Sequence, residues 1–95
     1  MEAVLGAQFI LGKKIGNGAF GTIFEGVQKA TKRKVAIKLE LIKADRLCNL
    51  EHEYQILQHL QGEEGIPQVF WFGKESNHYV LVMELLERNL ETVFS

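Results

Sequence analysis

The sequence predicts an α+β fold, an antiparallel five-stranded sheet with one main helix, on three observations. Five short segments are rich in β-branched and aromatic residues and end at glycine or polar turns, which is typical of strands. One longer segment carries apolar residues at helical spacing. The chain has 95 residues, 46% hydrophobic and 24% charged, which is the composition of one globular domain.

Three strands are expected in the first half of the chain, at 9–16, 22–27 and 34–42. The first two flank a glycine-rich segment, and the turn "KATKR" separates the second from the third. Alternation along the third strand assigns its side chains to two faces. One face takes Val35, Ile37, Leu39 and Leu41, and the other takes Ala36, Lys38 and Glu40.

The helix is expected over about 47–61, with Asn49 as its cap and Gly62 at its end. A projection at 100° per residue places six apolar side chains on one arc: Leu47, Leu50, Tyr54, Ile56, Leu57 and Leu60. After a loop around Pro67, strands are expected at 69–73 and 78–86, with Phe70, Trp71 and Phe72 in the core. Asn89 would cap a further short helix.

The stretch "GNGAFG" has the spacing G-x-G-x-x-G between two expected strands. Such a loop lets its backbone approach phosphate closely, but a plain hairpin turn with spare glycines would look the same. A dinucleotide-binding loop would open a helix after Gly21, whereas "TIFEGV" is poor helix material. Phosphate cover and a plain turn therefore remain open.

Two charged residues stand among apolar neighbours. Lys38 lies in the strand "VAIKLE", and Glu53 falls inside the apolar arc of the helix. Either charge is costly to bury alone, so we expect the two to face each other as an ion pair. Alternatively, both side chains reach solvent at an edge, or Glu53 pairs with another group. Glu51 is expected on the solvent face of the helix.

Composition argues against several other classes of function. The net charge is −1, and the basic turn "QKATKRK" lacks interleaved aromatic residues, so no nucleic-acid partner is expected. Cys48 is the sole cysteine and the three histidines are scattered, so neither a disulfide nor a metal site is expected. No segment resembles a signal peptide or a membrane span. We expect an intracellular protein, cytoplasmic and/or nuclear.

Taken together, the loop, Lys38 and Glu53 resemble the amino-terminal lobe of a eukaryotic protein kinase, in the same order and at fitting distances. Four segments are similar to sequences of the casein kinase one family, and the similarity extends over nearly the whole chain: "KIGNGAFG", "VAIKLE", "LQGEEGIPQVFWFG" and "VMELL". The resemblance implies a lobe and hinge over 1–86, with glycine loop 16–21. Residues 87–95 would start a second lobe, at which the chain is truncated.

The resemblance also implies an ATP site. Lys38 and Glu53 would be the catalytic pair organising the phosphates, Met83 the gatekeeper, and Glu84 to Leu86 the hinge that bonds adenine. Phe20, at the loop tip, would cover the phosphates. The whole implied binding set is Ile15, Gly16, Asn17, Gly18, Ala19, Phe20, Gly21, Thr22, Ile23, Ala36, Lys38, Met83, Glu84, Leu85 and Leu86, in which Ile15, Ile23 and Ala36 line the adenine slot.

The sequence departs from the family at two points: Thr22 stands where an acid is usual, and Glu87-Arg88 where a Gly-Pro pair is usual. Neither touches the lysine–glutamate pair. The catalytic-loop and Mg²⁺-binding motifs H-R-D and D-F-G are absent from the 95 residues, whose one aspartate is Asp45.

We therefore expect a serine/threonine kinase as the parent protein, using ATP and Mg²⁺ on acidic or already phosphorylated protein substrates. The fragment alone is expected to be inactive, and to self-associate through the surface that its second lobe would cover. The alternative is a non-catalytic module that binds nucleotide or a partner protein.

Overall fold

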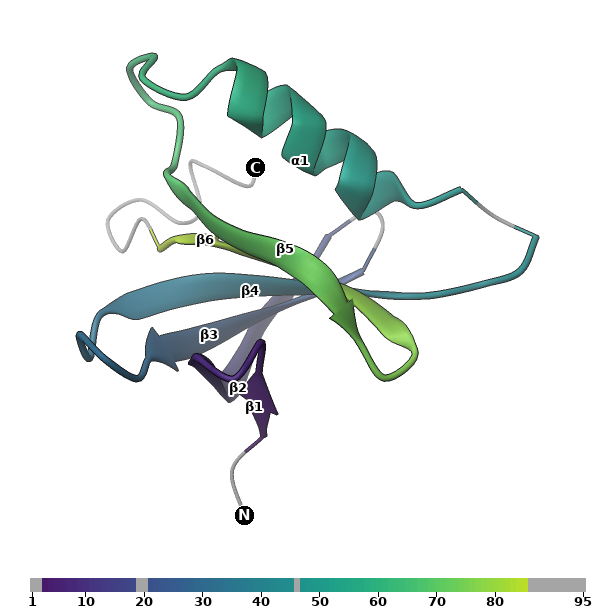
Figure 1. Cartoon of the computed structure of the whole chain (residues 1–95), viewed down its shortest axis with the longest axis horizontal. Helices are drawn as coiled ribbons and strands as arrows, with labels where there is room; N and C mark the ends of the chain where they lie inside the picture. Colours follow the sequence, from purple (N-terminus) through teal and green to yellow (C-terminus); the bar gives the residue numbers. More distant parts are fainter. Residues whose placement is uncertain (1–2, 19–20, 46, 86–95) are drawn as a thin grey trace.

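The computed structural model describes residues 3–18, 21–45 and 47–85. They form one antiparallel sheet of six strands with the spatial order β1-β2-β3-β4-β6-β5, and one helix, α1, lies across one face at its β4-β6-β5 end (Figure 1). The elements in chain order are β1 (Val4–Leu5), β2 (Phe9–Asn17), β3 (Thr22–Gln28), β4 (Lys34–Leu41), α1 (Asn49–His59), β5 (Val69–Glu75) and β6 (His78–Glu84).

The α+β architecture expected from the sequence is confirmed, with one strand more than the five predicted. The additional strand, β1, has two residues and pairs with β2, where Val4 lies opposite Ile10. Gly6, at a φ of +57°, leads out of it, and the Gly6 amide donates a hydrogen bond to a carboxylate oxygen of Glu75 at 3.0 Å. A strand of two residues gives no alternation to detect, so the sequence did not reveal it.

The two faces of the sheet bury separate clusters, as the alternation in β4 predicted. On one face Val35 and Ile37 pack with Phe9, Val80 and Val82, and Phe70 and Trp71 lie against them. On the other face Ala36 packs with Leu81 and Met83 and with Leu50 of helix α1, and Phe72 joins this cluster. The assignment of the three consecutive aromatic residues to the core is thus confirmed, with Phe72 on the helix-bearing face.

Helix α1 is shorter than predicted and has a different cap. It runs from Asn49 to His59, with Cys48 as the N-cap residue, whose sulfur accepts a hydrogen bond from the Glu51 amide at 3.1 Å. Asn49 was therefore wrongly assigned as the cap, because a cysteine sulfur is a weak acceptor that sequence rules do not favour at this position. The helix stops before Gly62, which takes a φ of +95° two residues beyond the C-cap Leu60.

The predicted apolar arc of the helix is too wide. Leu50 is buried, and Tyr54 and Leu57 pack against the same cluster, but Leu47 is 91% exposed and Ile56 is 45% exposed. Leu47 precedes the helix, so its place on a helical projection has no meaning. Glu51 is exposed, as expected.

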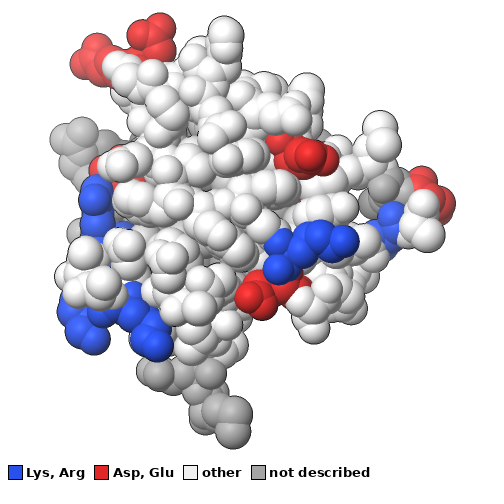
Figure 2. Space-filling view, viewed as in Figure 1, with Lys and Arg blue, Asp and Glu red and all other residues white. Residues whose placement is uncertain are grey.

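Charged side chains do not gather into one extended surface on the face drawn in Figure 2, where basic groups lie at the margin by the β3–β4 turn. Lys29, Lys32 and Arg33 in that turn are exposed, as a solvated turn requires. Within the described residues, no helix has the length and apolar character needed to cross a bilayer. The short helix predicted at Asn89 and the segment 87–95 lie outside the described residues.

Candidate functional site

The glycine-rich segment forms the hairpin between β2 and β3. Asn17 lies opposite Thr22 and Gly16 opposite Ile23, and the Gly18 amide donates to the Gly21 carbonyl at 2.7 Å. A hairpin is therefore present, as the plainer of the two interpretations required. The reasons for glycine at positions 16, 18 and 21 bear on whether the hairpin also covers phosphate.

The three glycines differ in what surrounds them. At Gly21 a Cβ atom would come within 2.0 Å of the Leu39 carbonyl oxygen, so the close approach of β3 to β4 requires glycine there. Among the residues that the structure describes, nothing lies within 4 Å of such an atom at Gly16, and at Gly18 the nearest atoms are at ordinary contact distance. Neither residue has a positive φ. Packing thus accounts for Gly21, whereas neither packing against the described residues nor a positive φ accounts for Gly16 and Gly18.

Lys38 lies in the middle of β4, on the face that carries helix α1. Its Nζ atom is 2.6 Å from Oε2 of Glu53, so the ion pair expected from the sequence is present. The two side chains are 19% and 32% exposed, respectively. The pair is therefore shielded but still reachable, and the alternative in which both groups point separately into solvent is wrong.

Strand register brings the other predicted residues of the sheet onto this same face. Ile23 lies opposite Lys38 across β3–β4, and Lys38 in turn lies opposite Leu81 on β6. Ala36 lies opposite Met83. Because directly opposed residues of an antiparallel pair point to the same side, Ile23, Ala36, Lys38 and Met83 share one face.

Three of these four residues are also core residues. Ile23, Ala36 and Met83 are 4%, 4% and 6% exposed, and Ala36 and Met83 belong to the cluster beneath helix α1. The face therefore joins an apolar floor to a charged group two residues farther along β4. Ile15 is half-buried near the end of β2, while Asn17 and Gly18 are exposed and Thr22 is half-buried at the hairpin.

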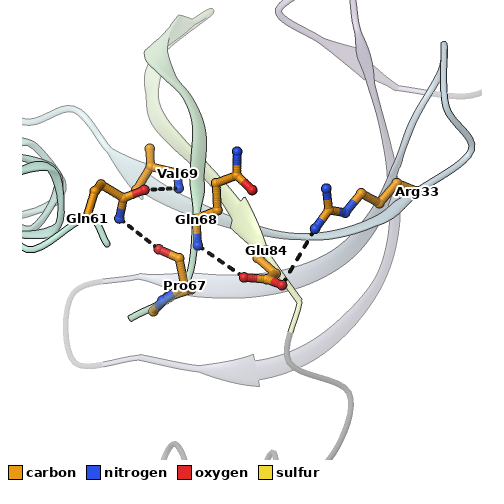
Figure 3. Close-up of polar contacts among 6 residues, drawn as sticks. All are labelled: Arg33, Gln61, Pro67, Gln68, Val69 and Glu84. Atoms are coloured by element: carbon orange, nitrogen blue, oxygen red, sulfur yellow. Dashed lines mark hydrogen bonds and ion pairs between the residues drawn. The ribbon is translucent and has the colours of Figure 1, made fainter. Parts of the chain in front are cut away.

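The expected hinge begins at the end of β6. The Glu84 side chain points away to the β3–β4 turn, where Oε2 lies 3.5 Å from Nη2 of Arg33, and Oε1 accepts from the Gln68 amide at 3.2 Å (Figure 3). Its own amide donates to the Gln68 carbonyl at 2.8 Å. These contacts fix the end of β6 within the sheet. Leu85 is half-buried, whereas Ala19, Phe20 and Leu86 lie outside the described residues.

Two residues that hold helix α1 in place were not identified from the sequence. Glu40 is 8% exposed and accepts hydrogen bonds from the Leu50 amide at 2.8 Å and the Asn49 amide at 3.3 Å. The available signal was its place on the helix-facing side of β4, two residues after Lys38. Gln61 joins the other end of the helix to β5. Its side-chain amide donates to the Pro67 carbonyl and accepts from the Val69 amide (Figure 3). It also donates to the Leu57 carbonyl.

The arrangement offers a lysine ammonium, held by a carboxylate, beside an apolar floor and a hairpin with two uncrowded glycines. A lysine in this position can bind a phosphate group as a point charge, and the carboxylate keeps the ammonium from sampling solvent. No group of three or more His, Cys, Asp or Glu side chains that could hold a metal ion occurs in the part of the chain that the structure describes.

Comparison with known proteins gives the same assignment as the geometry. Residues 9–95 match the family model described as "Protein kinase domain". The chain is 45% identical over 93 residues to the "Casein kinase I homolog RAG8" of Kluyveromyces lactis. This match covers 98% of the chain and 17% of the relative, so the chain spans about one sixth of the length of that protein.

Proposed function

The chain belongs to the protein kinase family, as an amino-terminal lobe of the casein kinase I type, and we propose that it is the ATP-binding lobe of a serine/threonine kinase. In this proposal the γ-phosphate of ATP passes to a hydroxyl group of a protein substrate. The full-length protein would bind both ATP and the protein substrate. The second lobe would contribute the catalytic base and the Mg²⁺ ligands.

The observation that carries the proposal is the 2.6 Å contact between Lys38 and Glu53 on the face shared with Ala36 and Met83. Phosphoryl transfer depends on positioning and on neutralising charge rather than on covalent chemistry by the protein. The ammonium of Lys38 would hold the phosphates, while Glu53 orients that ammonium. The apolar floor would receive the adenine ring, between Ile15 and Ile23 on one side and the hinge on the other.

The glycine hairpin supports the same proposal. Gly16 and Gly18 are free of crowding, so the backbone there can approach a bound group without a side chain in the way. The Gly18 amide is already engaged with Gly21, so this amide would contribute to a phosphate contact only if the hairpin changes shape. The hairpin would act as a cover over the phosphates rather than as a rigid cradle of amides.

Lys38→Met in the full-length protein is the direct test. Methionine keeps most of the side-chain volume but removes the charge, so phosphotransfer from Mg-ATP to a casein substrate should fall at least about 100-fold, as expected when a preorganised charge at the reacting group is lost. Lys14→Met is the matched control, because Lys14 is exposed on β2. Unchanged turnover in Lys38→Met would overturn the proposal.

The finer expectations from the resemblance remain part of this proposal: acidic or already phosphorylated substrates, an intracellular location, inactivity of the lobe alone and its self-association. A wild-type full-length protein that binds ATP but transfers no phosphate to serine, threonine or casein would favour the non-catalytic module instead. Light scattering on the isolated lobe tests self-association, and a monomer at high concentration would contradict it.

A further inference from the structure

Glu40 is a buried carboxylate at the amino-terminal end of helix α1. Oε1 accepts the Leu50 amide at 2.8 Å, and Oε2 accepts the Asn49 amide at 3.3 Å and the Asn49 side-chain amide at 3.1 Å. The Cys48 thiol lies 3.8 Å from Oε1. A carboxylate that accepts hydrogen bonds from the first amides of a helix satisfies groups that have no partner within the helix. Its negative charge also interacts favourably with the positive end of the helix dipole.

The carboxylate comes from the sheet and not from the helix or its flanking turn. Glu40 is in β4, so its contacts tie the start of the helix to the strand that carries Lys38. Lys38 and Glu40 are two residues apart, so they point to the same face at a separation of about 7 Å. One strand thus contacts the helix at two points, at its first turn through Glu40 and one turn later through Lys38 and Glu53.

Apolar packing alone does little to fix the helix. Of the eleven residues of α1, all of which the structure describes, Leu50 is the one that is buried. Tyr54 and Leu57 also pack against the sheet but stay partly exposed, and because apolar contact is not directional, this packing leaves the helix freedom to rotate and slide. The hydrogen bonds that the Glu40 carboxylate accepts are directional. They fix both the distance of the first helical turn from the sheet and the rotation of the helix about its axis.

We propose that Glu40 is a positioning residue, which holds the helix in the register that brings the Glu53 carboxylate to the Lys38 ammonium. Its role in phosphate handling rests on the function proposed above, whereas its control of the ion pair does not. Without the Glu40 carboxylate, the first turn of the helix separates from β4, and Lys38 loses its partner for a larger fraction of the time.

The test is the rate at which an amine-reactive N-hydroxysuccinimide ester acylates each lysine of the full-length protein, read by peptide mass spectrometry. In Glu40→Gln the charged acceptor is lost and the new amide faces backbone donors, so Lys38 should react about tenfold faster than in the wild type, with Lys74 unchanged. Glu53→Gln, which frees Lys38 directly, gives the upper limit. Glu51→Gln removes an exposed charge from the same turn and should leave Lys38 unchanged.

If the acylation rate of Lys38 in Glu40→Gln stays within about twofold of the wild-type rate, the proposal is overturned. The loss of hydrogen bonds to a charged group should change the rate by more than this factor. If Glu40→Gln loosens the whole fold and all lysines react faster alike, Asn49→Ala decides. This variant keeps the carboxylate and removes one of its contacts, so a selective rise at Lys38 of about threefold supports the proposal, and an unchanged rate overturns it.

Phosphotransfer is measured on the same variants. The KM for ATP should rise in Glu40→Gln by about the factor seen in acylation, and Glu51→Gln should match the wild type. A wild-type protein without phosphotransfer would refute the proposed function, while the acylation rates would still decide the role of Glu40.

Discussion

The ammonium of Lys38 lies 2.6 Å from a carboxylate oxygen of Glu53, although the two residues belong to different elements and stand 15 positions apart in the chain. The pair joins the centre of β4 to the middle of helix α1, on the face where Ala36 and Met83 form an apolar floor. Its place along β4, between the glycine hairpin and the end of β6, makes it the centre of the candidate site.

Glu53→Gln should separate activity from stability. The two side chains retain access to water, so we expect the free energy of unfolding to change by no more than about 1 kcal/mol. Phosphotransfer should nevertheless fall about tenfold or more, because the lysine is no longer oriented. Urea unfolding and steady-state kinetics on the full-length protein provide the two values. A loss of activity that is matched by a large loss of stability would assign the pair a structural role.

The glycines of the hairpin should respond differently to alanine. Gly21→Ala places a Cβ atom against the Leu39 carbonyl, so we expect a loss of about 2 kcal/mol or more in stability. The Cβ atom of Gly16→Ala would have no atom of the described residues within 4 Å, and Gly16 has no positive φ, so stability should stay the same or rise by about 0.4–1 kcal/mol.

Nucleotide binding separates the two interpretations of the loop. If the hairpin covers phosphate, Gly16→Ala should weaken ATP binding in the full-length protein, as measured by calorimetry, despite its intact stability. An unchanged affinity would show that Gly16 is a spare glycine of a plain turn.

Gln61 should hold the carboxyl end of the helix to β5. Its side chain makes three hydrogen bonds across the loop, to Leu57, Pro67 and Val69, at 2.9–3.1 Å. Because it is exposed, we expect Gln61→Ala to lower stability by only about 1 kcal/mol, with faster amide hydrogen exchange at Val69. Gln55→Ala is the control, because Gln55 is an exposed glutamine of helix α1 for which the described residues show no such bonds. Equal exchange in the two variants would contradict this assignment.

Cys48 should make stability depend on alkaline pH. Burial raises the pKa of the Cys48 thiol, the carboxylates of Glu40 and Glu51 add to the rise, and the hydrogen bond from the Glu51 amide opposes it. The unfolded chain therefore releases this proton first. Its contribution to stability is complete below the pKa of the thiol in the unfolded chain and is lost as the pH rises from there through the raised pKa of the folded state.

Cys48→Ser keeps a side-chain acceptor at the N-cap and removes the titration. The difference in stability between the wild type and Cys48→Ser should shift against the wild type between about pH 8 and pH 10. Comparing the two proteins at each pH cancels the titration of lysines and tyrosines. A constant difference over that range would contradict the expectation.

Patterning within single elements allowed most of the fold to be predicted. The alternation of residues in β4 predicted which side chains lie on each face of the strand. The ion pair of Lys38 and Glu53 was predicted because both charged residues stand at apolar positions. The ends of helix α1 and its N-cap residue were harder to predict. Cys48 is a weak capping residue, and Leu47 extends the apolar pattern beyond the start of the helix.

Contacts between elements were harder to predict from the sequence. Glu40 was assigned to the correct face but not to a partner, because two of its partners are backbone amides, which almost every residue carries and no pattern marks. The same reason hid the contacts of Gln61 with two carbonyls and one amide. The uncrowded state of Gly16 also depends on how β2 and β3 approach each other, and only coordinates give that.

The most direct test of the central claim is labelling of the full-length protein with an acyl-phosphate derivative of ATP, which acylates amines that lie beside the bound phosphates. We expect Lys38 to be the lysine labelled most strongly, with labelling suppressed by excess free ATP. Labelling spread over exposed lysines such as Lys14 and Lys74, with no effect of free ATP, would contradict the assignment of this face as the site for the phosphates of ATP.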